Sequence, residues 1–475
     1  MTVLVILLVG QAMATMDGSI LVVAAPSLRV DLHASGAELQ LVVAAYTLAF
    51  GALVVTGARL GDILGRRRAF MQGLAAFTAA SLLGGLAPNP TVLICARALQ
   101  GAAAALMTPQ VLSIIQSSFE GERRARAIGA YSMILAVGVA AGQIIGGLLI
   151  TAHLLAAAWR PALLLNAPIG ATLLVASRRR LPSIEPTGQR LDFGGVALLA
   201  GSLVALIVPL TFGRQYHWPV WVWPCLIASL IGAYTFARYE RRVAARGGNP
   251  VFDLGLLTLP GVAAGVLTVL LIMACYAGFL FMLTLHLQGA LGFSAFHAGL
   301  IFAIYASGFA TASLTWTRAG DTARARLPVI GPPLMGVALL AVGLIAAGGG
   351  WPTAATAPLL FVAGVGHAFG FSPLASRLTT TIAPAQAADL SGLILTASLI
   401  GQVTGVTAFV GIYLGAASHG SAYALAVTTG AIAAVLVVAG VSARCATGRS
   451  AAAHSQATSA CKRGDVAYQT SSPDH

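Results

Sequence analysis

Long apolar runs, each of about 20 residues, follow one another along almost the whole chain. A helix of that length crosses the hydrocarbon core of a bilayer, which is about 30 Å thick. Inside this core every backbone polar group must be bonded within the protein, so such a chain folds as a helix bundle. The mean hydropathy is +0.87 and only 9% of residues are charged, against about 25% in a soluble domain. The sequence therefore predicts an all-α polytopic membrane protein.

We predict fourteen spans, separated by turns rich in Gly, Pro, Asn and Ser. The predicted spans cover residues 2–27, 39–57, 70–87, 91–116, 127–151, 160–177, 193–212, 218–237, 259–285, 296–316, 327–348, 355–376, 390–415 and 421–442. The first run has neither a basic leader nor a small-residue cleavage site, so we interpret it as a span rather than a signal peptide. The polar segment 444–475 has little apolar surface, and we expect a disordered cytoplasmic tail.

Basic residues cluster on one side of this topology. Of the 27 Lys and Arg residues, 23 lie on the side that holds the loop 58–69, and 3 lie on the opposite side. The positive-inside rule places the richer side, with both termini, in the cytoplasm. The net charge of +13 is spread over short clusters between spans, so we do not expect nucleic-acid binding. The excess of arginine over lysine, with abundant alanine, is associated with GC-rich bacteria, and the expected location is a bacterial plasma membrane.

Two short motifs recur at one common offset. Arg-x-Gly-Asp at 59–62 returns at 318–321, and Gly-Gln-x-x-Gly at 142–146 returns at 401–405, each 259 residues later. The shared offset indicates an internal duplication. The two copies are separated by eight predicted spans. Because this number is even, both copies have the same orientation in the membrane. Parallel repeats of this kind are typical of one large class of transporters.

The duplication divides the chain. We predict an N-terminal six-helix bundle at 1–190, two inserted linker helices at 191–246 and a C-terminal six-helix bundle at 247–443, before the tail. The fold class is then two six-helix bundles plus two inserted helices.

The stretch 59–68, RLGDILGRRR, carries five charged residues in a chain that otherwise avoids charge. Its arginines anchor a cytoplasmic turn near the lipid phosphates, and topology alone explains them. Topology does not explain the carboxylate, which can pair with an arginine and latch two helical halves together. Both interpretations stay open. The candidate latch residues are Arg59, Asp62, Arg66 and Arg67, with Arg318 and Asp321 in the second copy.

Asp17 is the acidic residue deepest in a predicted span, about nine residues or roughly 14 Å from its outer end. An ionisable group at such depth is costly and indicates function. Arg97, in the fourth span, is the expected partner. Our hypothesis is that Arg97 holds Asp17 until a proton or a cationic substrate displaces it. The alternative is a permanent structural pair.

Other polar side chains within spans are candidates for a substrate cavity, although hydrogen bonding between helices explains each of them equally well. The candidates are Tyr46, Gln100, Gln110, Tyr131, Asn166, Tyr276, Tyr305 and His367.

Several stretches together resemble one known family. Ala58-Arg-Leu-Gly-Asp-x-x-Gly-Arg-Arg-x-x-Phe70 resembles the loop signature of the major facilitator superfamily. Met16-Asp-Gly-Ser-Ile, Arg97-Ala-Leu-Gln-Gly and Asn166-x-Pro-x-Gly resemble the motifs of its fourteen-span drug:proton antiporters. Ala58 stands where this signature has Gly, and Ile63 stands where it has a basic residue.

The fifth span carries a similar likeness. Gly142-Gln-x-x-Gly-Gly stands where the antiporters have Gly-Pro-x-x-Gly-Gly, so a kink-favouring proline is missing. The glycines still allow close contact between helices. The expected helix-packing motif is Gly138, Gly142, Gln143, Gly146 and Gly147.

The resemblance implies proton-coupled efflux of lipophilic or cationic drugs or antibiotics by alternating access. It implies a monomer in the lipid bilayer, with the proton as coupling ion, no other cofactor and no metal. Proton-coupled uptake of a small organic solute on the same fold is the alternative. The sequence has no Gly-x-x-x-x-Gly-Lys-Ser/Thr loop for ATP, no filter loop for a channel and no residue cluster for an enzyme.

Overall fold

The structure is a computed structural model that describes residues 2–151, 159–182, 192–213, 218–248, 250, 253–380, 382 and 386–469. Every regular element in these ranges is helical. The α-helices are α1 (Thr2–Asp31), α2 (Gly36–Leu64), α3 (Arg66–Gly85), α4 (Pro90–Ser118), α5 (Gly121–Thr151), α6 (Arg160–Leu164), α7 (Asn166–Arg180), α8 (Phe193–Phe212), α9 (Val222–Ala245), α10 (Val262–Thr284), α11 (Ala295–Thr315), α12 (Asp321–Ala346), α13 (Thr353–Thr380), α14 (Ala387–Ala416) and α15 (Ser421–Gln469).

The described helices confirm a multi-pass membrane protein. Ten helical stretches are long and apolar enough to cross a bilayer. Each predicted span falls on one or more of the α-helices, while the number of fourteen crossings stays a prediction.

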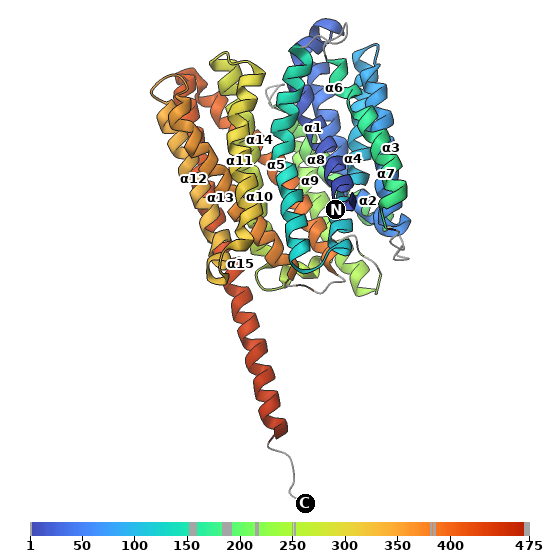
Figure 1. Cartoon of the computed structure of the whole chain (residues 1–475), viewed down its shortest axis with the longest axis vertical. Coiled ribbons are helices and arrows are strands. Elements are labelled where there is room, and N and C mark those ends of the chain that lie inside the picture. The colour runs from blue at the N-terminus through green and yellow to red at the C-terminus, as the bar shows by residue number, and fades with distance from the viewer. Residues whose placement is uncertain are drawn as a thin grey trace, which may run out of the picture.

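Two helical groups lie side by side, α1–α7 in one and α10–α15 in the other (Figure 1). In the first group α1 packs against α5, and α4 packs against α2 and α3. In the second group α10 packs against α14, and α13 packs against α11 and α12. The pairs correspond in chain order, so the packing repeats together with the sequence motifs.

The repeated glycine motif lies at equivalent helix contacts. A Cβ added to Gly142 would overlap the Ser19 hydroxyl and lie 2.6 Å from the Met16 carbonyl oxygen of α1. A Cβ added to Gly405, in the second copy, would overlap the Ala274 carbonyl oxygen of α10. Only glycine lets two helix backbones approach so closely. The sequence motif therefore marks the α1–α5 and α10–α14 contacts.

Other positions of the motif extend the contact on α5. A Cβ at Gly138 would lie 3.0 Å from the Cβ of Thr15, and one at Gly146 would lie 2.7 Å from Ile20 Cγ1. The side chain of Gln143 and the surroundings of Gly147 lie outside the described residues.

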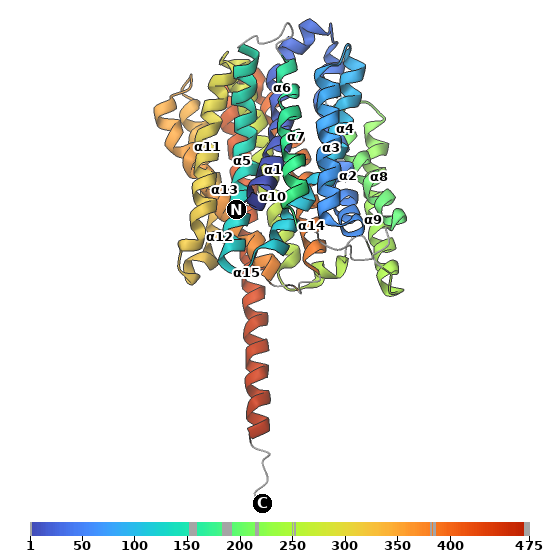
Figure 2. The ribbon, with the colours of Figure 1, turned by 45° about the vertical axis from the view of Figure 1, so that its right-hand side comes forward.

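The inserted helices α8 and α9 pack against each other at one edge of the molecule, beside α2 (Figure 2). Asp192 caps α8 as its sequence position predicts, because its Oδ1 accepts the Gly195 amide at 3.1 Å. From α8, Ile207 lies close to α2, and the Leu210 carbonyl accepts the Thr407 hydroxyl of α14 at 3.2 Å. The inserted pair thus contacts both groups.

Two boundaries differ from the sequence prediction. The predicted span 160–177 is broken at Leu165 into α6 and α7. Pro168 then lies in the first turn of α7, where the missing amide needs no partner within the helix. The predicted loop 58–69 is also shorter than expected, because α2 continues to Leu64. A single residue, Gly65 with φ of 86°, leads directly into α3.

The predicted disordered tail differs as well. α15 continues to Gln469, and its last part projects from the helical body (Figure 1). The segment after residue 444 is rich in alanine, which has the highest helix propensity. A helix that starts in the bundle can therefore continue on helix propensity.

The glycine contacts generate a stability prediction. Gly405→Val places a branched side chain against the α10 backbone, and we expect a loss of about 1–3 kcal/mol from overpacking. Gly411→Val, in the same helix with open space around its Cβ, serves as the control. Thermal unfolding of the purified protein in detergent measures both. Equal unfolding temperatures for the two variants would contradict the close contact.

Candidate functional site

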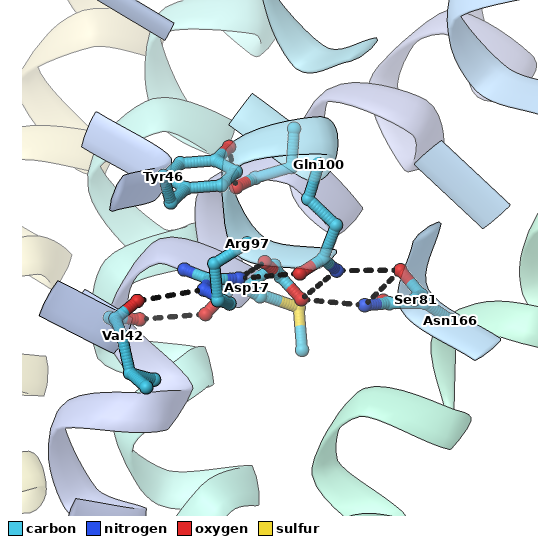
Figure 3. Close-up of polar contacts among 10 residues, drawn as sticks. Asp17, Val42, Tyr46, Ser81, Arg97, Gln100 and Asn166 are labelled. Atoms are coloured by element: carbon cyan, nitrogen blue, oxygen red, sulfur yellow. Dashed lines mark hydrogen bonds and ion pairs between the residues drawn. The ribbon is translucent and has the colours of Figure 1, made fainter. Parts of the chain in front are cut away.

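The candidate site is a buried ion pair between two helices of the first group (Figure 3). Asp17 of α1 and Arg97 of α4 are each 1% exposed. Arg97 Nη1 donates directly to Asp17 Oδ2. An isolated charge cannot be kept in such surroundings, so each ion depends on its partner and on further hydrogen bonds.

The carboxylate is also held by two side-chain amides. Asn166 Nδ2 donates to Asp17 Oδ1 at 2.8 Å, and Gln100 Nε2 donates to the same oxygen at 3.2 Å. Both amides also donate to the hydroxyl oxygen of Ser81, at 3.4 and 2.7 Å. The Asp17 network therefore joins α1, α3, α4 and α7.

Arg97 has contacts that do not depend on Asp17. It donates to the Gln100 side-chain oxygen at 2.9 Å and, through Nε, to the Val42 carbonyl at 3.3 Å. Its guanidinium lies over the Tyr46 ring, 4.5 Å from the centroid, which is a favourable cation–π geometry. The Tyr46 hydroxyl donates to the Ala14 carbonyl of α1 at 2.9 Å. The arginine therefore keeps polar partners if Asp17 becomes neutral.

Local packing explains why these side chains meet. A Cβ at Gly101, one turn after Arg97, would overlap the Tyr46 carbonyl, so α4 and α2 are in close contact at this level. Gly142 of α5 packs against the residues on both sides of Asp17. Asn166 is the first residue of α7, directly after the helix break. The small residues and the break together bring four helices to one carboxylate.

The predicted cavity residues fall into separate places. Tyr46, Gln100 and Asn166 belong to the Asp17 network. Gln110 instead joins α4 to α2, because its Nε2 donates to the Gly57 carbonyl at 2.8 Å. The remaining predicted residues are Tyr131, partly buried on α5, and the group Tyr276, Tyr305 and His367, which lies in the second helical group.

Ser81 was missed by sequence reasoning. It is fully buried on α3 and accepts from both amides of the network. A serine inside an apolar span usually bonds to its own helix, so its position alone carries no signal.

The model of the family described as Major Facilitator Superfamily matches residues 7–406, which include the whole Asp17 network. The chain belongs to the major facilitator superfamily. Two solved structures share its fold at 13% identity: the human organic anion transporter MFSD10, with a TM-score of 0.66, and the proton:xylose symporter XylE, with a TM-score of 0.62. Each alignment covers 93% of this chain, and it covers 99% of MFSD10 and 94% of XylE.

Three curated relatives are named for export, resistance or transport. The chain is 35% identical to the cephamycin export protein CmcT of Amycolatopsis lactamdurans, over 90% of this chain and 87% of that protein. It is 34% identical to the puromycin resistance protein pur8 of Streptomyces alboniger, over 89% and 85%. It is 33% identical to the probable actinorhodin transporter of Streptomyces coelicolor, over 86% and 72%.

The charged stretch 59–68, which resembles the superfamily loop signature, holds the Asp62 carboxylate between two arginines. Asp62 lies 3.9 Å from Arg59 Nη1 and 3.7 Å from Arg66 Nη2, so these are loose ion pairs. Arg59 Nη2 also donates to the Pro250 carbonyl at 2.8 Å, in the segment that leads into the second helical group. Arg67 Nη2 donates to the Arg178 carbonyl in the last turn of α7, at 2.6 Å. The loop therefore bonds to segments distant in sequence.

The second copy of the loop is arranged differently. Asp321 is fully exposed and lies 3.5 Å from Arg324, one of the arginines that follow it in the second copy. Asp321 begins α12, so Arg324 is one turn further on the same helix, whereas Arg318 ends the preceding 3₁₀ turn (Trp316–Arg318). The closed arrangement of the first loop is thus not repeated.

The buried pair generates a second prediction. Arg97→Gln leaves the Asp17 carboxylate buried without its counter-charge, and we expect a loss of about 3–5 kcal/mol at neutral pH. The double variant Asp17→Asn/Arg97→Gln removes both charges and should lose less than Arg97→Gln alone. Thermal unfolding in detergent measures the stability of the wild type, Asp17→Asn, Arg97→Gln and the double variant.

The exposed pair Arg126–Glu122, 2.7 Å apart, provides the control. Arg126→Gln should hardly change the unfolding temperature, because water solvates both ions. Strictly additive losses for Asp17→Asn and Arg97→Gln would show that the buried pair carries no coupling.

Proposed function

We propose that this chain exports antibiotics or other lipophilic drugs, including cationic ones, across a bacterial plasma membrane in exchange for protons. The names of three relatives between 33% and 35% identical support export of such compounds. The buried Asp17–Arg97 pair is the observation that supports proton coupling. In this proposal both termini are cytoplasmic, the carrier is a monomer in the lipid bilayer, and the proton is its only coupling ion.

Asp17 is the proposed proton site. Its carboxylate lies among apolar helices and is paired with Arg97, so its charge strongly affects its surroundings. A proton from outside would bind to a carboxylate oxygen and remove the attraction to Arg97. Arg97 would stay on the Val42 carbonyl, the Gln100 oxygen and the Tyr46 ring. Asp17 and Arg97 can therefore separate while the Arg97 guanidinium keeps its other polar partners.

Helix α5 is the proposed link from this site to the other helical group. The turn of α1 that carries Asp17 packs directly on Gly142 of α5. Near its cytoplasmic end, α5 contacts α11, where a Cβ at Gly129 would lie 2.9 Å from the Ser313 carbonyl oxygen. A shift of α1 on protonation would therefore reach a contact between the two groups. This is the physical basis we propose for alternating access.

The charged loop is the proposed cytoplasmic latch. The Arg59–Pro250 hydrogen bond ties α2 to the segment that enters the second group. Rocking of the two groups would have to stretch or break this bond. Asp62 would serve to hold Arg59 in position.

The third prediction concerns Asp17 and transport. In inverted membrane vesicles from a host without its own drug pumps, an acidic interior should drive ethidium accumulation by the wild type. Asp17→Asn should lower this accumulation about tenfold or more, because the proton and drug sites lose their coupling. Exchange of ethidium without a pH gradient should continue. Ethidium fluorescence measures both activities.

Glu122→Gln, which neutralises an exposed carboxylate on α5, is the matched control and should transport at the wild-type rate. Gradient-driven accumulation by Asp17→Asn equal to that of the wild type would overturn the proton assignment. Accumulation only in right-side-out vesicles would instead show an uptake symporter, as XylE is named.

A further inference from the structure

A second polar group lies among aromatic rings in the C-terminal half. His367 of α13 is 3% exposed, and its Nδ1 lies 2.8 Å from the hydroxyl of Tyr305 on α11. The imidazole centroid lies 4.9 Å from the ring of Tyr276 on α10 and 4.6 Å from that of Phe309. Phe371 stands edge-on at 6.4 Å. Three helices thus converge on one histidine.

The repeat relates this aromatic cluster to the Asp17 site. Tyr305 stands 259 residues after Tyr46, and Tyr276 stands 259 residues after Asp17. Helices α10, α11 and α13 also correspond in packing to α1, α2 and α4. The cluster is therefore the C-terminal counterpart of the ionic network. Aromatic groups replace the ions there.

One atom of the cluster has no partner. His367 Nε2 is buried and makes no hydrogen bond within the described part of the chain. A buried nitrogen in this state needs a partner that the protein itself does not supply. The Tyr305 hydroxyl has Nδ1 as its hydrogen-bond partner. If Tyr305 donates to Nδ1, the ring proton is on Nε2, which is then a free donor.

The chemistry around this donor restricts the ligand. Tyr305 and Phe309 are buried, whereas Tyr276 and Phe371 are only partly buried, so these two rings form the less buried side of the cluster. Helices α10 and α11 carry no acidic or basic side chain apart from histidine, and α13 carries only Arg377, ten residues from His367. A free N–H between aromatic faces, without a counter-charge, suits a neutral acceptor oxygen on a flat aromatic ring.

We propose that His367, Tyr276 and Tyr305 form a substrate subsite for flat aromatic compounds that carry a carbonyl or quinone oxygen. His367 Nε2–H donates to that oxygen, and the Tyr276 ring lies against the aromatic system. The proposal rests on the proposed export function and names a substrate class for it. The two halves then have different tasks, with the proton at Asp17 and the substrate oxygen at His367.

The fourth prediction compares two flat, cationic, fluorescent probes. Daunorubicin carries quinone oxygens, whereas ethidium carries no acceptor oxygen. His367→Phe should raise the Kd and KM for daunorubicin about tenfold, as expected for one lost hydrogen bond, and leave those for ethidium within about twofold. His367→Gln keeps an N–H donor and should restore part of the daunorubicin affinity. Fluorescence titration of purified protein measures binding, and inverted vesicles measure transport.

His297→Gln, at an exposed histidine of α11, is the control and should change neither probe. Equal weakening of both probes by His367→Phe would show that His367 only supports the fold, and no change in either would show that Nε2 holds water. Both results would overturn the subsite. Histidine-dependent daunorubicin binding without any export by the wild type would reject the proposed function and keep the subsite.

Discussion

The ion pair between Asp17 and Arg97 is the interaction on which the rest of this structure depends. Two opposite charges inside an apolar bundle stay ionised only if they are in contact and hydrogen-bonded on their remaining faces. The amides of Gln100 and Asn166 and the ring of Tyr46 meet these requirements. They do so only because small residues let four helices approach one another. In the N-terminal half, the close helix packing is therefore also what stabilises the buried charges.

The internal repeat places equivalent helix contacts in the C-terminal half. The same glycine spacing brings α5 onto α1 and α14 onto α10, so the two halves have the same backbone contacts. The side chains at the equivalent centres differ, apart from the tyrosine that stands at both Tyr46 and Tyr305. One centre is ionic and hydrogen-bonded, and the other is aromatic, with a nitrogen of His367 that has no hydrogen-bond partner among the described residues. Duplication preserved the architecture of the halves, while their chemistry separated.

The sequence predicted the helical fold, the repeat and the partnership of Asp17 with Arg97, because long apolar runs and rare intramembrane charges leave few alternatives. It did not predict Ser81, since a lone serine in a span looks the same whether or not it accepts from a neighbouring helix. It also predicts a loop at 58–69, where α2 continues to Leu64 and only Gly65 separates it from α3. The unequal second loop at Asp321 depends on where α12 begins, and spacing alone does not give this.

The inserted pair α8 and α9 has a consequence for how a membrane-dissolved compound reaches the carrier. α8 touches α2 through Ile207 and α14 through Leu210, so it covers the seam between the halves on that edge. A compound that diffuses within the bilayer is blocked by α8 at that seam. Within the described residues, the seam along α5 and α11 is closed by the contact of these two helices, so a lipid-borne compound would have to separate them to enter on that side.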